Sequence, residues 1–219
     1  MKSYGIEVDP NIIGYNSSIR DKSTIVKLLI NIVRYLTIYP VKPLKTLNIQ
    51  NTKTRIALIL NIAKMSRILI CEDKKIHTFQ FPFDLSISND SIKIYYDNIE
   101  IDSGILTILS TTFTDLNDGQ SIEKIIENYW GAISDLEISE NEARIYSGLI
   151  TYLISFEPGY LRFDYDDNTD RTDPNNHPLN HLDIYYTNKN TFKIGLSDRL
   201  SYTQLINVLD IAKPCCKMK

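Results

Sequence analysis

The spacing of apolar and polar residues changes character several times along the chain. Residues 22–36, KSTIVKLLINIVRYL, place three polar side chains at spacings of four and three, which predicts a helix that is apolar except for one narrow stripe. Residues 52–69, TKTRIALILNIAKMSRIL, predict a second, mainly apolar helix that ends near Cys71. We expect these two helices to pack together as an N-terminal helical part over about residues 20–71.

The middle of the chain alternates between strand and helix signals. Residues 76–101 consist of short alternating pieces separated by Asn-Asp and Asp-Asn turn signals, which predicts an antiparallel meander. Residues 103–113, SGILTILSTTF, are compatible with either type, and their threonine and isoleucine content favours a strand. Ser121 can cap the next helix, and Ser139 with Glu142 forms a capping box for another.

The C-terminal part predicts three strands and a closing helix that begins at a second capping box, Ser201 with Gln204. Because successive side chains of a strand point to opposite faces, the strands separate an apolar row from a polar row. The apolar row, expected to face the core, contains Leu161, Phe163, Tyr165, Leu182 and Ile184. The polar row, expected to face outward, contains Arg162, Asp164, Asp166, His181, Asp183 and Lys193, with His177 supplied by the preceding loop.

The order of elements predicts the fold class. Helices, strands, helices, strands and a final helix follow one another without regular βαβ alternation or an internal repeat. We therefore expect an α+β fold in which antiparallel sheet segments pack against helices. One globular domain should cover residues 1–212, and residues 213–219 should form a flexible tail.

Composition places the chain among ordinary globular proteins. Its 219 residues are 43% hydrophobic and 23% charged, with a net charge of -3, which argues against a wholesale nucleic-acid coat. Polar residues interrupt the longest apolar stretches, so no membrane span is expected. The first residues lack the apolar core of a signal peptide, and we expect a cytoplasmic protein.

The polar row and its two histidines form the clearest candidate site. Carboxylates and a neutral imidazole can hold a divalent metal ion, and a nearby cation can offset phosphate charge. The candidate catalytic residues are Asp164, Asp166, His177, His181 and Asp183, with Asp164, His177 and His181 as metal ligands and Arg162 and Lys193 as phosphate-binding residues. The alternative is a water-facing sheet surface on which opposite charges pair across strands.

Other catalytic signatures are absent from the sequence. The chain has no glycine-rich phosphate loop and no GxSxG elbow, and it contains only eight glycines. A Rossmann or P-loop nucleotide-binding enzyme is therefore not expected.

The segments RFDYD and HPLNHLDI, followed by a short strand and a final helix, resemble a little-characterised bacterial family often encoded in defence-associated gene neighbourhoods. The shared pattern falls on Phe163, Asp164, Tyr165, Asp166, His177, Pro178, His181 and Leu182. Relatives often carry a second histidine after the leucine, where this chain has Asp183. The resemblance implies antiviral defence as the setting.

Three functional hypotheses follow, and whether the chain is an enzyme stays open among them. The first is an accessory or effector subunit that acts through protein-protein interaction, with a partner encoded nearby or a second copy of itself. The second is a metal-assisted phosphodiesterase or nuclease-like hydrolase. The third is a non-catalytic nucleic-acid binder, for which residues 34–45, RYLTIYPVKPLK, together with Arg55, Lys64 and Arg67 could supply a basic stripe.

Overall fold

The computed structural model describes residues 2–16, 19, 21–44, 56–62, 66–88, 91–115, 122–187 and 190–215. The predicted α+β class is confirmed, with antiparallel sheets and packed helices. The chain divides into two compact units, the first made of residues 1–10, 42–81 and 158–219 and the second of residues 11–41 and 82–157. The predicted domain bounds, 1–212 with a tail from 213, stay a prediction.

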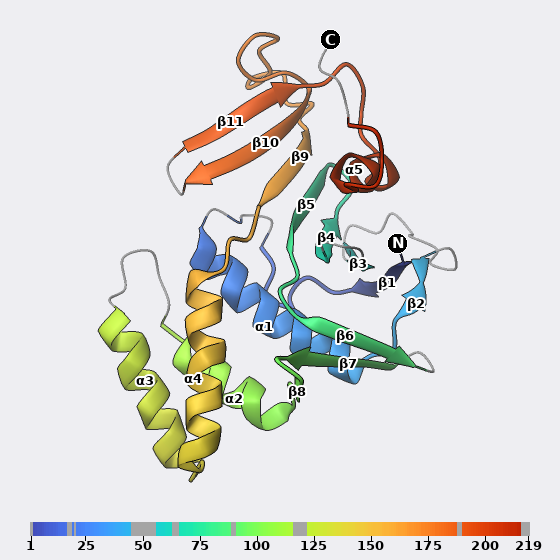
Figure 1. Ribbon diagram of the computed structural model, residues 1–219. Coiled ribbons are helices and arrows are strands. Elements are labelled where there is room, and N and C mark those ends of the chain that lie inside the picture. Colours follow the sequence, from blue (N-terminus) through green and yellow to red (C-terminus); the bar gives the residue numbers. More distant parts are fainter. Residues whose placement is uncertain are drawn as a thin grey trace. The chain divides into compact units, whose positions relative to one another are not determined.

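The first unit is built on an eight-stranded antiparallel sheet (Figure 1). Its strand order is β11-β10-β9-β5-β4-β3-β1-β2, so strands distant in sequence become neighbours where β9 pairs with β5. The elements are β1 (Lys2–Val8), β2 (Lys42–Pro43), β3 (Ile56–Ile62), β4 (Arg67–Cys71), β5 (Lys75–Gln80), β9 (Leu161–Tyr165), β10 (Asn180–Thr187), β11 (Asn190–Gly195) and α5 (Tyr202–Leu209).

One face of this sheet packs against α5. The helix begins at the predicted capping box, in which the Ser201 hydroxyl accepts a hydrogen bond from the backbone N–H of Gln204. Its buried side chains and those of four adjacent strands form one apolar cluster, which contains Ile59, Leu69, Ile76, Phe163, Leu205 and Ile206. Phe163 of the predicted apolar row is 2% exposed and belongs to this cluster, as expected.

The helix predicted over residues 52–69 is wrong where the structure describes it, because this segment contributes β3 and the start of β4. β3 lies between β1 and β4, and both of its faces are buried. A strand that is apolar on both faces has no period-two alternation and cannot be distinguished from a buried helix by pattern alone. Among its described residues, the N-terminal helical part therefore contains one helix, Lys22–Ile38.

The second unit contains four helices and a small antiparallel sheet among its described residues (Figure 1). Its elements are α1 (Lys22–Ile38), β6 (Asp84–Ser88), β7 (Ser91–Tyr96), β8 (Ile99–Glu100), α2 (Ser103–Thr112), α3 (Ile122–Asp135) and α4 (Glu140–Ser155). The predicted meander is thus split, since β5 joins the large sheet while β6 to β8 form their own. Asp97 and Asn98, at φ values of 48° and 65°, make the predicted turn between β7 and β8.

The observed helix starts agree with the capping signals in the sequence better than with the intrinsic helix and strand propensities of the residues. The strand favoured for residues 103–113 is wrong, because α2 begins there with Asp102 accepting from the Ile105 amide at 2.9 Å. The capping box of Ser139 and Glu142 opens α4 as predicted. Helix α3 is also confirmed, although its proposed cap, Ser121, lies outside the described residues.

Gly131 in α3 offers a test of local helix energetics. A Cβ built on this residue meets no atom within 4 Å. Replacing Gly131 by alanine should therefore raise the free energy of unfolding by about 0.5–1 kcal/mol, because alanine loses less backbone entropy in a helix. Denaturant unfolding monitored by circular dichroism measures this change. Gly159→Ala is the control of opposite sign, since Gly159 has a φ of 50° that strains any other residue.

Candidate functional site

Strand register places the predicted polar row on one face of the large sheet. Asp164 on β9 lies opposite His181 on β10, and Arg162 lies opposite Asp183. Lys193 on β11 in turn lies opposite Asp183. Residues paired across antiparallel strands share a face, so the predicted convergence of these five side chains is confirmed.

The expectation that this face points into water is wrong. His181 is 0% exposed, Asp183 is 2% exposed and Asp164 is 6% exposed. The connection between β9 and β10 contacts this face, since the ring of His177 packs against that of His181. Alternation identifies which residues share a face, but only the packing of this connection and of neighbouring side chains decides whether that face meets solvent.

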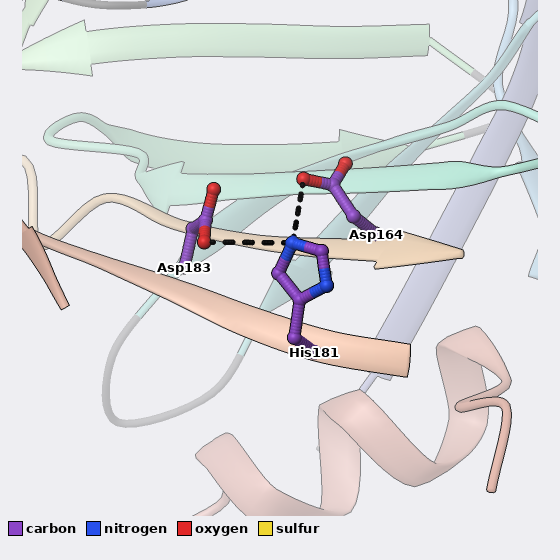
Figure 2. Close-up of side chains that lie close together, drawn as sticks. All are labelled: Asp164, His181 and Asp183. Carbon is purple, nitrogen blue, oxygen red and sulfur yellow. Dashed lines mark ion pairs between the residues drawn. The ribbon is translucent and has the colours of Figure 1, made fainter. Parts of the chain in front are cut away.

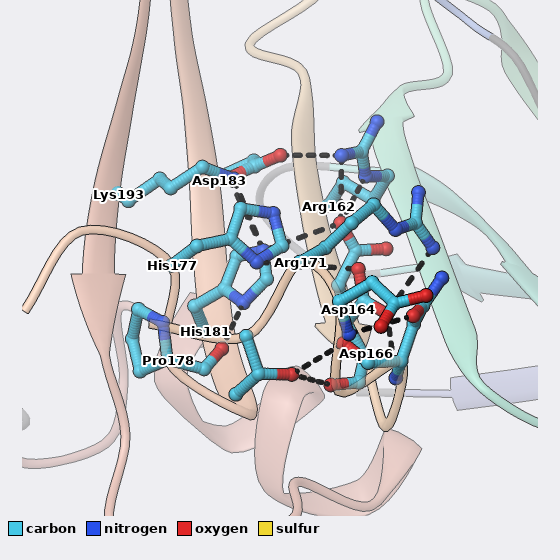
Figure 3. Close-up of polar contacts among 12 residues, drawn as sticks. Arg162, Asp164, Asp166, Arg171, His177, Pro178, His181, Asp183 and Lys193 are labelled. Atoms are coloured by element: carbon cyan, nitrogen blue, oxygen red, sulfur yellow. Dashed lines mark hydrogen bonds and ion pairs between the residues drawn. The ribbon is translucent and has the colours of Figure 1, made fainter. Parts of the chain in front are cut away.

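Arg162 links the two carboxylates of the cluster (Figure 3). Its Nε donates to Asp164 Oδ2 at 2.7 Å, and its Nη2 contacts both that oxygen and Asp183 Oδ2. Its Nη1 donates to the Tyr185 hydroxyl at 2.7 Å. Since a planar guanidinium carries five donors in fixed directions, these contacts hold Asp164, Asp183 and Tyr185 in one arrangement.

His181 is oriented by a backbone carbonyl. Its Nδ1 lies 2.7 Å from the Pro178 carbonyl oxygen, which can only accept, so Nδ1 carries a proton. Lys193 Nζ lies 3.1 Å from the other ring nitrogen, Nε2, and 2.7 Å from Asp183 Oδ1. Nε2 also lies 3.5 Å from Asp164 Oδ2, so this nitrogen faces both an ammonium group and a carboxylate.

The charges of the cluster balance. Two buried carboxylates, Asp164 and Asp183, face two cations, Arg162 and Lys193. Burial by itself would raise the pKa of Asp164, but the contacts with His181 and the Arg162 guanidinium outweigh it and lower that pKa to about 2. Burial alone would lower the pKa of Arg162, yet the carboxylate of Asp164 and its other contacts raise it above its ordinary value. The pair of Asp164 and Arg162 is thus charged at neutral pH.

Three residues of the cluster also have the geometry of metal ligands (Figure 2). His181 Nε2 lies 3.5 Å from Asp164 Oδ2 and 3.7 Å from Asp183 Oδ1. Ligand atoms bound tetrahedrally to zinc at about 2.0–2.1 Å stand about 3.3 Å apart, close to these separations. An ion shared by His181 and Asp183 would, however, compete with the ammonium group of Lys193, which contacts both residues.

His177 and Asp166, the remaining predicted site residues, lie beside this cluster. The ring of His177 packs edge-on against that of His181 with 4.6 Å between their centroids. Its Nδ1 faces Asp166 Oδ2 at 4.0 Å, and Arg171 contacts Asp166 at 3.2 Å (Figure 3). In the described part of the chain, the residues with metal-ligand geometry are Asp164, His181 and Asp183. The third member of the group is thus Asp183, whereas the sequence predicted His177.

Sequence reasoning missed several partners of the cluster. The roles of the Tyr185 hydroxyl and the Pro178 carbonyl depend on contacts that no spacing rule identifies. His77, which the sequence suggests is an isolated strand residue, is buried in β5 opposite Arg162 and has its Nδ1 2.7 Å from the Tyr160 hydroxyl. Burial lowers the pKa of His77. The pairing of β5 with β9 creates this proximity between distant segments.

The proposed basic stripe loses one member in the structure. Arg67 is 4% exposed, and it donates to the Thr78 hydroxyl at 3.1 Å and to the Gly159 carbonyl at 2.5 Å. Burial lowers the pKa of Arg67 to about 10. Arg67 is therefore not placed to contact a phosphate backbone, and Arg55 and Lys64 lie outside the described residues.

Comparison of the chain with protein-family models, with curated proteins and with solved structures gives no match. The resemblance to the defence-associated family stays a prediction. Within the described residues, no helix is both long enough and apolar enough to span a membrane.

Proposed function

We propose that this chain is a non-catalytic accessory subunit that acts through protein-protein contact, in the bacterial antiviral setting implied by the resemblance. The observation that carries the proposal is the closed, charge-balanced cluster around Arg162. Its acidic side chains and His181 are buried, and their contacts are made with groups of the protein itself. Such a cluster is suited to fixing a loop and a strand edge.

Catalysis makes different demands on the same residues. A general base or nucleophile must reach a substrate atom within hydrogen-bond distance. His181 Nε2 instead faces Lys193, and Arg162, the candidate phosphate ligand, is committed to Asp164, Asp183 and Tyr185. The role of these residues is therefore better explained by stabilisation of the strands and of the 166–179 connection.

One observation favours the alternative of a metal-assisted phosphodiesterase. Among the described residues, no group donates a hydrogen bond to the buried Asp164 Oδ1 atom, so this oxygen could accept a cation. The separations between His181 and the two carboxylates also suit a divalent ion. This reading requires Lys193 to withdraw, and the lysine side chain, 28% exposed, has a route to solvent.

Replacing Lys193 by methionine distinguishes the two functions. The variant keeps the aliphatic stem but loses the ammonium contacts with His181 and Asp183. If the cluster is structural, the free energy of unfolding should fall by about 1.5 kcal/mol, the lower end for a hydrogen bond to a charged group, because Arg162 still holds Asp183. Thermal unfolding with and without Zn²⁺ or Mn²⁺ should show no rescue by metal.

The controls use a surface pair and a ligand deletion. Lys93→Met removes an exposed contact with Glu100 and should leave the unfolding midpoint unchanged. Metal stabilisation of Lys193→Met that disappears in the Lys193→Met/His181→Ala double variant would support the metal enzyme instead.

Co-purification of the tagged chain with the product of an adjacent gene tests for the partner. Phosphodiester turnover by the chain alone contradicts a non-catalytic role.

A further inference from the structure

Helix α3 exposes a stripe of large apolar side chains. Ile122 is 61% exposed, Ile126 is 49% exposed and Trp130 is 56% exposed. Their spacing of four residues places them along one side of the helix. Ile125 and Tyr129 of the same helix are buried, so its apolar residues divide into an inner row and an outer row. We call Ile122, Ile126 and Trp130 the α3 stripe.

Packing within the second unit uses the inner row. The Tyr129 hydroxyl donates to the Ala143 carbonyl of α4, and Asn128 Nδ2 lies 3.4 Å from the Thr112 carbonyl at the end of α2. The α3 stripe is left exposed beside these contacts. Contiguous exposed apolar groups rimmed by polar residues are typical of interaction surfaces.

The segment that carries the α3 stripe is acidic. Residues 122–145 carry six exposed carboxylates against two exposed cations, Lys124 and Arg144. The carboxylates belong to Glu123, Glu127, Asp135, Glu137, Glu140 and Glu142. Glu123 and Glu127 follow the stripe residues Ile122 and Ile126 directly, so they border the stripe along the helix, and Lys124 contacts Glu127 at 3.1 Å. A partner that carries positive charge beside its apolar anchors would complement this surface.

We propose that the α3 stripe binds an amphipathic helix of a partner protein in which lysine or arginine flanks the apolar face. This inference rests on the proposed function as an interaction subunit and names its surface. The three stripe residues span about two turns, which matches anchors on one face of a partner helix. Complementary charge favours this occupant and orients it.

The acidic rim argues against two other occupants. In a two-fold dimer through α3, the same patch meets itself, which places Glu123 and Glu127 of one copy near those of the other. Like charges so juxtaposed disfavour that contact. A membrane with anionic lipids would be repelled by the same carboxylates.

Trp130 allows a direct test because it is the chain's only tryptophan. The probe is a synthetic 15-residue helical peptide with leucines at i, i+3, i+4 and i+7 and lysines flanking them. Its control has glutamates in place of the lysines. Titration of the full chain with the lysine peptide should produce a saturable blue shift of Trp130 fluorescence. The dissociation constant obtained from it should be at least tenfold lower than that for the glutamate peptide. Added salt should weaken the binding.

Variants separate apolar from electrostatic recognition. Ile126→Lys should abolish the binding, whereas Val208→Lys, at an exposed aliphatic position on α5, should leave it intact. Glu123→Lys/Glu127→Lys should reverse the preference between the two peptides. Circular dichroism checks that each variant is folded, and the exposure of the substituted side chains favours this result.

Two outcomes of the peptide titration overturn the inference. Equal affinity for both peptides removes the charge argument, and a blue shift that grows with protein concentration alone indicates self-association. If a natural partner co-purifies equally well with Ile126→Lys, that partner uses another surface, so the inference fails while the proposed function stands. If the lysine peptide binds as expected but the chain also turns over a phosphodiester, the non-catalytic function fails and the α3 surface stands.

Discussion

Replacing Asp183 by alanine is expected to lower the free energy of unfolding by about 3–5 kcal/mol, the cost of removing one partner from a buried ion pair. The Asp183 side chain is 2% exposed and accepts from both Arg162 and Lys193. Its removal leaves the Lys193 ammonium beside His181 without a carboxylate and takes one of two anions from Arg162. Denaturant unfolding of the purified variant measures the loss.

An exposed ion pair provides the matched control for Asp183→Ala. Asp167 contacts Lys74 Nζ at 2.7 Å, the same distance as between Asp183 and Lys193, but its side chain is 48% exposed. Asp167→Ala should change stability little, because water and mobile ions replace the lost partner. Similar losses in the two variants would mean that burial does not determine the strength of the Asp183 contacts, contrary to the structural role proposed for the cluster.

Stability should also depend on acid pH through Asp164. The pKa of this carboxyl is lowered from 3.8 to about 2 in the folded protein, so the folded state retains the charged form to lower pH than the unfolded state does. The stabilisation is fully present above the unfolded pKa and is lost as pH falls from about 4 through about 2. A shift of roughly two units corresponds to about 2–3 kcal/mol. Urea unfolding at a series of pH values measures it.

Asp164→Asn isolates this contribution from that of other carboxyls. Asparagine keeps the size of the side chain but does not titrate, and the variant should be less stable than the wild type at pH 7. Its stability should fall less steeply between about pH 4 and pH 2. If the free energy of unfolding depends on pH in the same way in both proteins over that interval, the contacts with Arg162 and His181 do not lower the pKa of Asp164.

The elements that the sequence predicted well carry a clear periodic signal. The helices α4 and α5 have apolar periodicity and also a capping box, and the β9 to β11 strands have period-two alternation. The prediction failed for two segments whose apolar pattern is ambiguous. The continuous apolar run of β3 resembles a buried helix, and the threonines of α2 favour a strand although Asp102 caps a helix there. Packing against neighbouring elements outweighs intrinsic propensity in both segments.

For the candidate site, alternation along three strands was sufficient to group Arg162, Asp164, His181, Asp183 and Lys193, because the two-residue period fixes which side chains share a face. Burial of that group was decided by the tertiary structure. It follows from the connection that returns through Pro178 to His181 and from the pairing of β9 with β5, which joins residues far apart in sequence. The same residue pattern could serve a water-facing surface or an interior ion network, and long-range packing, which sets the local solvation, makes it the latter.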